Sequence, residues 1–321
     1  MGITLKGLSK ITGYSAITIS RTLNKPDLVK GKTREKILCA VKKYHYTPNN
    51  VAKALVYNRT NIIYLYVPYN LDPTNQFVLQ VSAGISGYLG EHGYSVLLSK
   101  KWYQHETVDG LILMGLTIED EENLKTLSIE KPLVLFGHSD NVDCIDVDNI
   151  KGMEMITDHA IEKGYKKIAF VGISENKKFT QDRYLGYQNS MQRHNLDANK
   201  NYVVFTSNNA KSGYLAGINL LKYYPEIDCI VCSSDDLAAG VIQAANDSNR
   251  SVPESLGVTG FDGLGKELII KPELTTIHQP IYEIGVELAK LLLKKINHPR
   301  NVDAGISYYT PELKIGNSTR I

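Results

Sequence analysis

The sequence TLKGLSKITGYSAITISRTLN, residues 4–24, predicts two short helices joined by a tight turn. Thr4 is placed to cap the first helix, because its hydroxyl can accept a bond from a free N–H group. One side of that helix is apolar and carries Leu5, Leu8 and Ile11. Gly13 ends the helix, since glycine adopts the left-handed backbone of a tight turn at little cost.

The second helix has an inward side and an exposed side. Ser15 is placed to cap it, and Ile19 and Leu23, four residues apart, face inward. The opposite side carries Ala16, Ile17, Ser20 and Arg21. Two short helices joined by a glycine-containing turn form a helix-turn-helix, whose second helix can enter the DNA major groove. The alternative is a plain helical hairpin.

Charge separates the first 60 residues from the rest of the chain. The net charge of the whole chain is only +2, but residues 1–60 carry 12 Lys and Arg against two Asp and Glu. The remaining residues carry 24 basic and 32 acidic side chains. A basic segment on an acidic body is typical of a protein that binds a polyanion such as DNA. A solvated basic surface is the alternative, but two acids do little to offset twelve bases.

A third helix completes the predicted head. A polar loop from Lys25 to Lys32 leads to Thr33, which precedes the helix. The apolar positions of this helix keep a helical period and are Ile37, Leu38, Val41 and Tyr44. Residues 49–55 follow Pro48 as about two helical turns, too short to be stable alone in water. The sequence therefore predicts a DNA-binding domain at 1–48 and a hinge with its linker at 49–60.

From residue 61 onward apolar strand patterns alternate with helical ones. Strands are predicted from IIYLYV, SVLLS, DGLILM, PLVLFG, CIDVD, KIAFVG, YVVFT, CIVCSS and LGVTGF. Helices are predicted over 77–93 and 152–163. This alternation indicates an α/β fold with doubly wound parallel sheets. We expect two subdomains, about 61–162 with 280–305 and about 163–279 with 306–321, and a ligand cleft at the carboxyl ends of their strands.

Several classes of protein and site are not supported by the sequence. There is no run of 18 apolar residues and no apolar leader, so we expect a cytoplasmic protein without a membrane span. The four cysteines are expected to be buried free thiols, since no second pair gives Cys229 and Cys232 metal spacing. Residues 260–267 resemble a P-loop but end in Glu267, where magnesium binding needs a hydroxyl. We expect no catalytic site, metal or cofactor.

Motifs spread along the chain resemble the LacI family of transcriptional repressors. In the head they are Gly13-Tyr14-Ser15, Thr18-Ile19-Ser20-Arg21, Thr33-Arg34-Glu35-Lys36-Ile37 and Tyr46-x-Pro48-Asn49-x-x-Ala52-x-x-Leu55. In the body they include Asp148-Asn149-x-x-Gly152, Arg183-x-x-Gly186-Tyr187, Asp236-x-x-Ala239, Gly260-Phe261-Asp262 and Gln279-Pro280. The resemblance implies a periplasmic-binding-protein-like effector domain, a homodimer, a palindromic operator in double-stranded DNA and a small effector, usually a sugar.

Candidate DNA contacts follow from the helix-turn-helix and from this resemblance. Arg21 is the base-reading candidate, because arginine pairs bidentately with guanine O6 and N7; a phosphate contact is its alternative role. Ala16 and Ile17 would read shape and thymine methyl groups. Ser15, Thr18, Ser20, Asn24 and Thr33 are placed for phosphates. The resemblance makes Leu55 an apolar wedge in the minor groove and adds Thr4, Tyr46, Asn49 and Ala52.

Candidate effector contacts lie in the body. Arg183 offers a rigid fork of donors for hydroxyls or a carboxylate. Asp235 and Asp262 are expected to accept hydroxyl hydrogens, and Gln279 lies at a chain crossing between the subdomains. The remaining candidates are Phe77 and Phe136, which could stack on a sugar ring or belong to the core, together with His138 and Asp148. The phrase Phe136-Gly137-His138-Ser139 hints at the maltose-type branch of the family.

One departure from the family concerns residues 98–108, where the family has a long helix and this chain has only SKKWYQHET. We expect that helix to be shortened or absent. The sequence supports a sugar-responsive, dimeric DNA-binding repressor. Alternatives are a catabolite-control regulator that uses a phosphorylated carrier protein as corepressor, and a solute-binding protein, against which the basic head argues.

Overall fold

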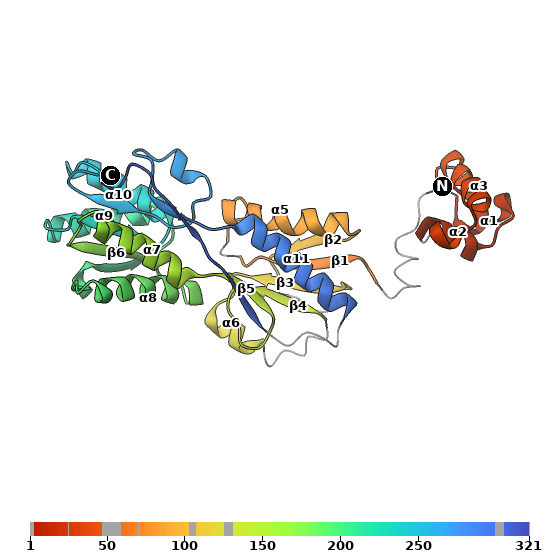
Figure 1. Cartoon of the computed structure of the whole chain (residues 1–321), viewed down its shortest axis with the longest axis horizontal. Coiled ribbons are helices and arrows are strands. Elements are labelled where there is room, and N and C mark those ends of the chain that lie inside the picture. Colours follow the sequence, from red (N-terminus) through yellow and green to blue (C-terminus); the bar gives the residue numbers. More distant parts are fainter. Residues whose placement is uncertain are drawn as a thin grey trace. The chain divides into compact units, whose positions relative to one another are not determined.

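The computed structural model describes residues 3–24, 26–46, 59–69, 71–102, 107–124, 131–298 and 305–320. The chain divides into two compact units, residues 1–61 and 62–321, called here the head and the body. Figure 1 shows the head as a small group of helices and the body as two subdomains with sheets at their centres. Among the described residues, no helix has both the length and the apolar character needed to cross a membrane.

The head is built around one apolar contact point. Its described elements are α1 (Leu5–Thr12), α2 (Ala16–Asn24), the 3-10 turn η1 (Pro26–Leu28) and α3 (Gly31–Lys43). The Oγ1 atom of Thr4 accepts the Gly7 N–H at 3.1 Å, and Gly13 ends α1 at a φ of 73°, as predicted. Leu8, Ile19 and Ile37, one from each helix, are fully buried against one another. The predicted three-helix head is confirmed.

Some predictions about side chains of the head are wrong. Ile11 is 50% exposed, because residues three apart on a helix drift by about 60° per step and the third leaves the buried stripe. Leu38 and Cys39 are also exposed, since they lie roughly 100° and 200° around α3 from the buried Ile37. The helix α3 begins at Gly31, so Thr33 lies within its first turn and does not precede it.

The N-terminal subdomain of the body holds a six-stranded parallel sheet in the order β11-β5-β4-β3-β1-β2. Its strands are β1 (Ile62–Tyr66), β2 (Ser95–Ser99), β3 (Gly110–Met114), β4 (Leu133–Phe136), β5 (Cys144–Val147) and β11 (Ile306–Tyr309). Two helices, α5 (Gln76–Glu91) and α11 (Ile281–Asn297), share an apolar cluster with one face of the sheet. These helices touch closely, since a Cβ atom on Gly84 would lie 2.2 Å from the Tyr282 carbonyl oxygen.

The C-terminal subdomain holds a four-stranded parallel sheet in the order β7-β6-β8-β9. Its strands are β6 (Ile168–Ile173), β7 (Val203–Thr206), β8 (Cys229–Cys232) and β9 (Gly257–Thr259). The helices α7 (Asn149–Glu162) and α8 (Lys178–Arg193) bury one face, and α9 (Ala210–Tyr223) and α10 (Asp235–Asp247) bury the other. Further short elements are η2 (Lys200–Tyr202), η3 (Lys266–Leu268) and the antiparallel pair β10 (Thr276–His278) and β12 (Glu312–Lys314). Both sheets are doubly wound, as predicted.

The chain crosses between the subdomains three times, and the first and third crossings lie at different residues from those predicted. The helix α7 packs on α8 and on the C-terminal sheet, so residues 149–162 belong to the C-terminal subdomain. The strand β11 pairs with β5 in the N-terminal sheet, so residues 306–309 belong there. The second crossing, between β10 and α11, falls near Pro280, as predicted. Strand and helix patterns identify these elements, but only packing decides which sheet receives them.

The described residues between β2 and β3 contain no helix. Residues 100–102 and 107–109 have irregular structure, and 103–106 lie outside the described residues. In place of a helix, the Trp102 ring packs edge-on against Tyr66, with 5.0 Å between centroids. The Tyr64 hydroxyl donates to the Lys101 carbonyl at 2.7 Å. The short connection is therefore held by aromatic side chains of β1.

Candidate functional site

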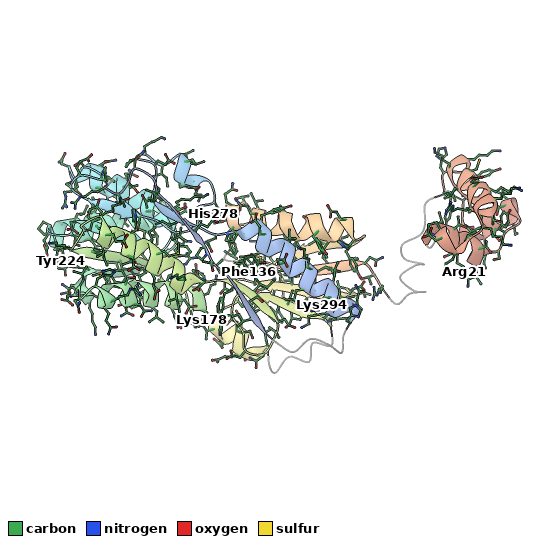
Figure 2. All side chains as sticks on the ribbon, in the orientation of Figure 1. Arg21, Phe136, Lys178, Tyr224, His278 and Lys294 are labelled. Atoms are coloured by element: carbon green, nitrogen blue, oxygen red, sulfur yellow. The ribbon has the colours of Figure 1, made fainter. Side chains whose placement is uncertain are left out.

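The exposed face of α2 is the candidate nucleic-acid surface of the head. Ile17 is 65% exposed and Arg21 is exposed, with its side chain on the surface of the head in Figure 2. Ala16 and Ser20 are half-buried. This pair of side chains suits the DNA major groove. The arginine can donate to acceptors on base edges, and the apolar side chain can contact thymine methyl groups and the groove surface.

The remaining DNA-contact candidates have mixed positions. The Ser15 Oγ accepts the Thr18 N–H at 3.1 Å and shares a bond with the Thr18 hydroxyl at 2.9 Å, so both belong to the cap of α2. Thr4 is exposed at the start of α1, and Thr33 is half-buried in α3. Tyr46 packs against the core of the head, and burial raises its pKa. The side chain of Asn24 and the hinge candidates Asn49, Ala52 and Leu55 lie outside the described residues.

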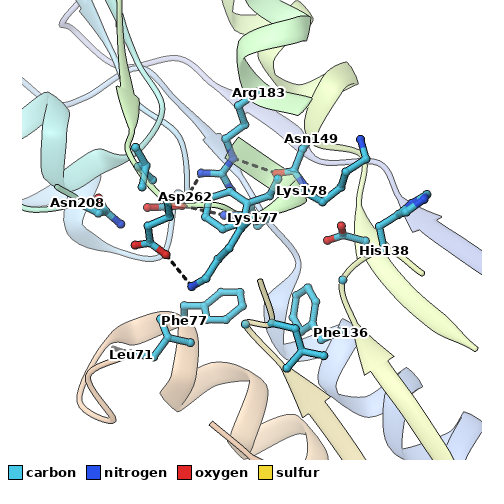
Figure 3. A pocket seen from close by; sticks show the side chains of 18 of the residues that line it. Leu71, Phe77, Phe136, His138, Asn149, Lys177, Lys178, Arg183, Asn208 and Asp262 are labelled. Atoms are coloured by element: carbon cyan, nitrogen blue, oxygen red, sulfur yellow. Dashed lines mark hydrogen bonds and ion pairs between the residues drawn. The ribbon is translucent and has the colours of Figure 1, made fainter. Parts of the chain in front are cut away.

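A cavity of about 140 Å³ lies between the two subdomains of the body. Its apolar wall comes mainly from the N-terminal subdomain, where the Phe77 and Phe136 rings meet at 5.2 Å and an angle of 46°. Figure 3 shows these rings and Leu71 on one side, and Arg183, Asn149 and Lys177 on the other. Phe136 and Lys178 mark its place in the middle of the body in Figure 2. The cavity thus has an apolar wall facing a polar one.

Arg183 is the central polar residue of the cavity. It is only 5% exposed, and its guanidinium lies flat over the Phe261 ring, 3.8 Å from the centroid. Its Nε donates to Asn149 Oδ1 at 2.9 Å, and its Nη1 donates to the Ser233 carbonyl at 2.6 Å. The Nη1 atom also lies 3.5 Å from Asp262 Oδ1. Arg183 is therefore fixed in one orientation before any ligand arrives, with its fork at the cavity wall.

Asp262 and Gln279 join this network at the cavity wall. Gln279 donates its Nε2 hydrogen to Asp262 Oδ1 at 2.9 Å and is itself buried. Burial raises the pKa of Asp262 to about 7, while the nearby Arg183 charge opposes the shift. Both residues line the cavity, together with Arg183, Phe77, Phe136 and His138. His138 also bonds through Nδ1 to the Tyr308 hydroxyl at 2.8 Å, which holds its ring in place.

Two predicted effector contacts do not line the cavity. The Asp148 Oδ1 accepts the Lys151 N–H at 2.9 Å, so Asp148 is the N-cap of α7. Asp235 is 2% exposed and accepts from the Thr276 hydroxyl at 2.5 Å and the Gly263 N–H at 2.8 Å. Its carboxylate therefore links the segments that carry Gly263 and Thr276 by hydrogen bonds. At the start of a helix, the side chains of adjacent residues point in different directions. The sequence alone therefore does not reveal which of these side chains faces a ligand.

The sequence prediction missed several residues of the cavity wall. The polar and charged ones are Asn75, Glu121, Asp146, Asn149, Glu175, Lys177, Lys178 and Asn208. Asp146 had a readable signal, since an acid inside the buried strand CIDV is unusual and needs a reason. Glu121 had none, because α6 (Ile118–Asn123) is an acidic helix of only six residues that reads as a solvated surface.

Metal chemistry finds no support in the described part of the chain, where no group of three His, Cys, Asp or Glu side chains is placed to share an ion. Cys229 joins the apolar cluster on one face of β8 and Cys232 the cluster on the other. Burial raises the pKa of both thiols far above the usual value. They are inert core residues, and only Cys39 departs from the prediction of buried cysteines.

Comparison with known families gives two matches. The family model described as "Bacterial regulatory proteins, lacI family" matches residues 4–49. The model described as "Periplasmic binding protein-like domain" matches residues 157–319.

Relatives match along nearly the whole chain. A protein of Bacillus subtilis (strain 168) described as an uncharacterized HTH-type transcriptional regulator, YvdE, is 35% identical over 98% of this chain and 99% of its own length. The HTH-type transcriptional regulator RegA of Clostridium saccharobutylicum is 33% identical over 92% of this chain and 93% of its own.

Solved structures agree with the fold. A transcriptional regulator CelR–cellobiose complex superimposes with a TM-score of 0.75 at 25% identity, covering 98% of this chain and 99% of the other. The lac repressor dimer bound to operator and the anti-inducer ONPF superimposes with a TM-score of 0.87 at 22% identity, covering 99% of both chains, and supports the fold alone.

Proposed function

This chain belongs to the LacI family of bacterial regulatory proteins, and we propose that a saccharide bound in the cavity of the body controls its affinity for an operator. The chain is a DNA-binding transcriptional regulator and not an enzyme. Because it acts on bacterial DNA, its place is the cytoplasm. Residues 1–48 are the DNA-binding domain, 49–60 the hinge and the body the effector domain.

The DNA-binding half of the proposal rests on the head. Its α2 helix enters the major groove, where Arg21 pairs with a base and Ile17 packs against the groove floor. Ser15, Thr18, Ser20 and Thr33 position the head on phosphates. Leu55, in the hinge, is an apolar wedge in the minor groove. A homodimer places two heads on one palindromic site, so operator symmetry mirrors that of the protein.

The effector half rests on the cavity, and the observation that carries it is the two-sided wall. A sugar ring has an apolar face of C–H groups and an edge of hydroxyls. The Phe77 and Phe136 rings suit the first, while Arg183, Asn149 and Asp262 suit the second. Since the cavity lies between two subdomains, a bound ligand favours one relative arrangement of them and so shifts the populations of the dimer. The two rivals, a carrier-protein corepressor and solute transport, leave the cavity or the basic head unused.

The test has two steps. First, the full chain is used to select binding sites from a random double-stranded DNA library, which should yield an inverted repeat. Second, the affinity for that site is measured with and without each member of a saccharide panel. We expect at least one saccharide to change it by roughly 5- to 150-fold. A library that yields no preferred sequence would refute the DNA half, and a panel without effect would refute the effector half.

A further inference from the structure

We propose that the effector is an unphosphorylated saccharide and that Glu121 and Asp146 bind its hydroxyl groups at the wall of the cavity. This inference rests on the proposed function, since it narrows the class of ligand for the same site. The charged side chains of the cavity determine whether it binds a sugar or a sugar phosphate.

Each lysine and arginine on the described cavity wall already has a carboxylate partner. The Lys177 Nζ lies 2.6 Å from Glu175, Lys178 pairs with Asp182, and Arg183 lies 3.5 Å from Asp262. A phosphate that took one of these cations would leave a largely buried carboxylate without its partner. Leaving a buried charge uncompensated is costly, so the cavity offers no ready partner for a dianion.

Two further carboxyls line the cavity without a salt bridge to a described residue. Glu121 comes from α6 and Asp146 from β5, and neither forms an ion pair with any residue that the structure describes. Asp146 is 6% exposed, and its Oδ1 accepts the neighbouring Val147 N–H at 2.8 Å. The Glu121 carboxyl lies close to Gly137, where an added Cβ would lie 3.3 Å from its Oε1. When ionised, these acids repel a phosphate placed beside them.

The N-terminus of α8 is the feature most favourable to an anion, because helix N-termini attract negative charge. It begins at Lys178 beside the cavity, and its N-cap Lys177 makes no side-chain cap bond. However, Glu175 and Asp182 flank this turn through their pairs with Lys177 and Lys178. The carboxylates of Glu175 and Asp182 thus already place negative charge at this helix N-terminus, and they would repel a ligand phosphate.

Hydroxyl groups are the ligands that two unpaired carboxyls suit. A carboxylate accepts hydroxyl hydrogens, and a protonated carboxyl both donates and accepts. Burial raises the pKa of Glu121 to about 8 and that of Asp146 to about 7, so near neutral pH both forms occur. Either form can bond to a hydroxyl, whereas only the protonated form can donate to a phosphate oxygen and the ionised form repels it.

The deciding experiment measures binding of matched sugars to the full chain by calorimetry and thermal shift. The probes are glucose, maltose, trehalose and cellobiose, each with its own 6-phosphate, and ribose with ribose 5-phosphate. We expect one or more unphosphorylated sugars to bind and each phosphate counterpart to bind at least tenfold more weakly. A phosphorylated sugar that binds as tightly as its counterpart, or more tightly, overturns this inference and leaves the proposed function standing. A panel without any binding overturns both.

Variants of one helix then test the residues. Glu121→Ala removes a hydrogen-bond partner of the ligand and should weaken binding of the sugar found above by about tenfold. Glu122→Ala is the matched control, because Glu122 is exposed on the same helix and does not line the cavity. Asp146→Asn keeps the shape and an acceptor, and it should weaken binding less than Glu121→Ala does. Equal sugar affinity of Glu121→Ala and wild type, with both folded by circular dichroism, overturns the assignment of Glu121.

Discussion

The structure makes Arg183 both a ligand contact and a structural residue, and the Arg183→Ala variant separates the two roles. The change removes the cation over the Phe261 ring, the bond to Asn149 Oδ1 and the ion pair with Asp262. An unpaired buried polar group costs about 1–3 kcal/mol. Asp262 is partly exposed and keeps its bond from Gln279, so we take the middle of that range.

That free energy predicts a measurable shift in the melting temperature of the body. A loss of about 2 kcal/mol lowers the midpoint by roughly 4–8 °C for a unit of this size. The head has its own core of Leu8, Ile19 and Ile37, which the change does not touch. Operator affinity without effector should therefore stay within about threefold of wild type, since distant independent sites are nearly additive. The effector response should be lost.

The assay is a titration of operator binding against effector for wild type and Arg183→Ala, with a thermal melt of each protein alone. Arg193→Ala is the matched control, because Arg193 lies on the same helix but pairs with Asp158 on the surface. The control should keep the response and lose little stability, as surface pairs contribute about 0–1 kcal/mol. An Arg183→Ala protein that responds at the wild-type effector concentration would place the ligand elsewhere.

Further predictions address the head, the hinge and pH. Operator affinity should fall linearly with salt on logarithmic axes, because phosphate contacts release counterions, and a salt-independent affinity would contradict this. Arg21→Ala should cost roughly 1–3 kcal/mol and relax preference at one base pair per half-site, whereas an equal loss on random DNA would make Arg21 a phosphate ligand. Leu55→Ala should reduce DNA bending, measured by energy transfer between labelled DNA ends, more than it lowers the melting temperature. The raised pKa values of Glu121 and Asp146 mean that the native body binds more protons than the unfolded chain between about pH 4 and 8. Their contribution to stability is therefore present at low pH and lost as pH rises, so we expect the melting temperature to fall between pH 5 and 8 and Asp146→Asn to flatten that fall.

Local chemistry determined much of this protein from sequence alone. Thr4 and Gly13 mark the two ends of α1, because helix capping and left-handed turns depend on single residues and their neighbours. The alternation of strand and helix patterns fixed the doubly wound fold, since each apolar run needs a sheet to bury it. Arg183, Asp262 and Gln279 were identified from family motifs, and the structure brings all three to one cavity.

The tertiary structure decided what depends on packing between distant segments. It assigned α7 and β11 to their subdomains, because a helix or strand of given pattern fits either sheet until its neighbours are known. It also separated Asp146, which lines the cavity, from Asp148, which caps a helix two residues later. Glu121 shows the same limit most clearly. It belongs to an acidic helix of surface character, and only the tertiary structure brings its carboxyl group to the cavity wall, close to Gly137, 16 residues away in the chain.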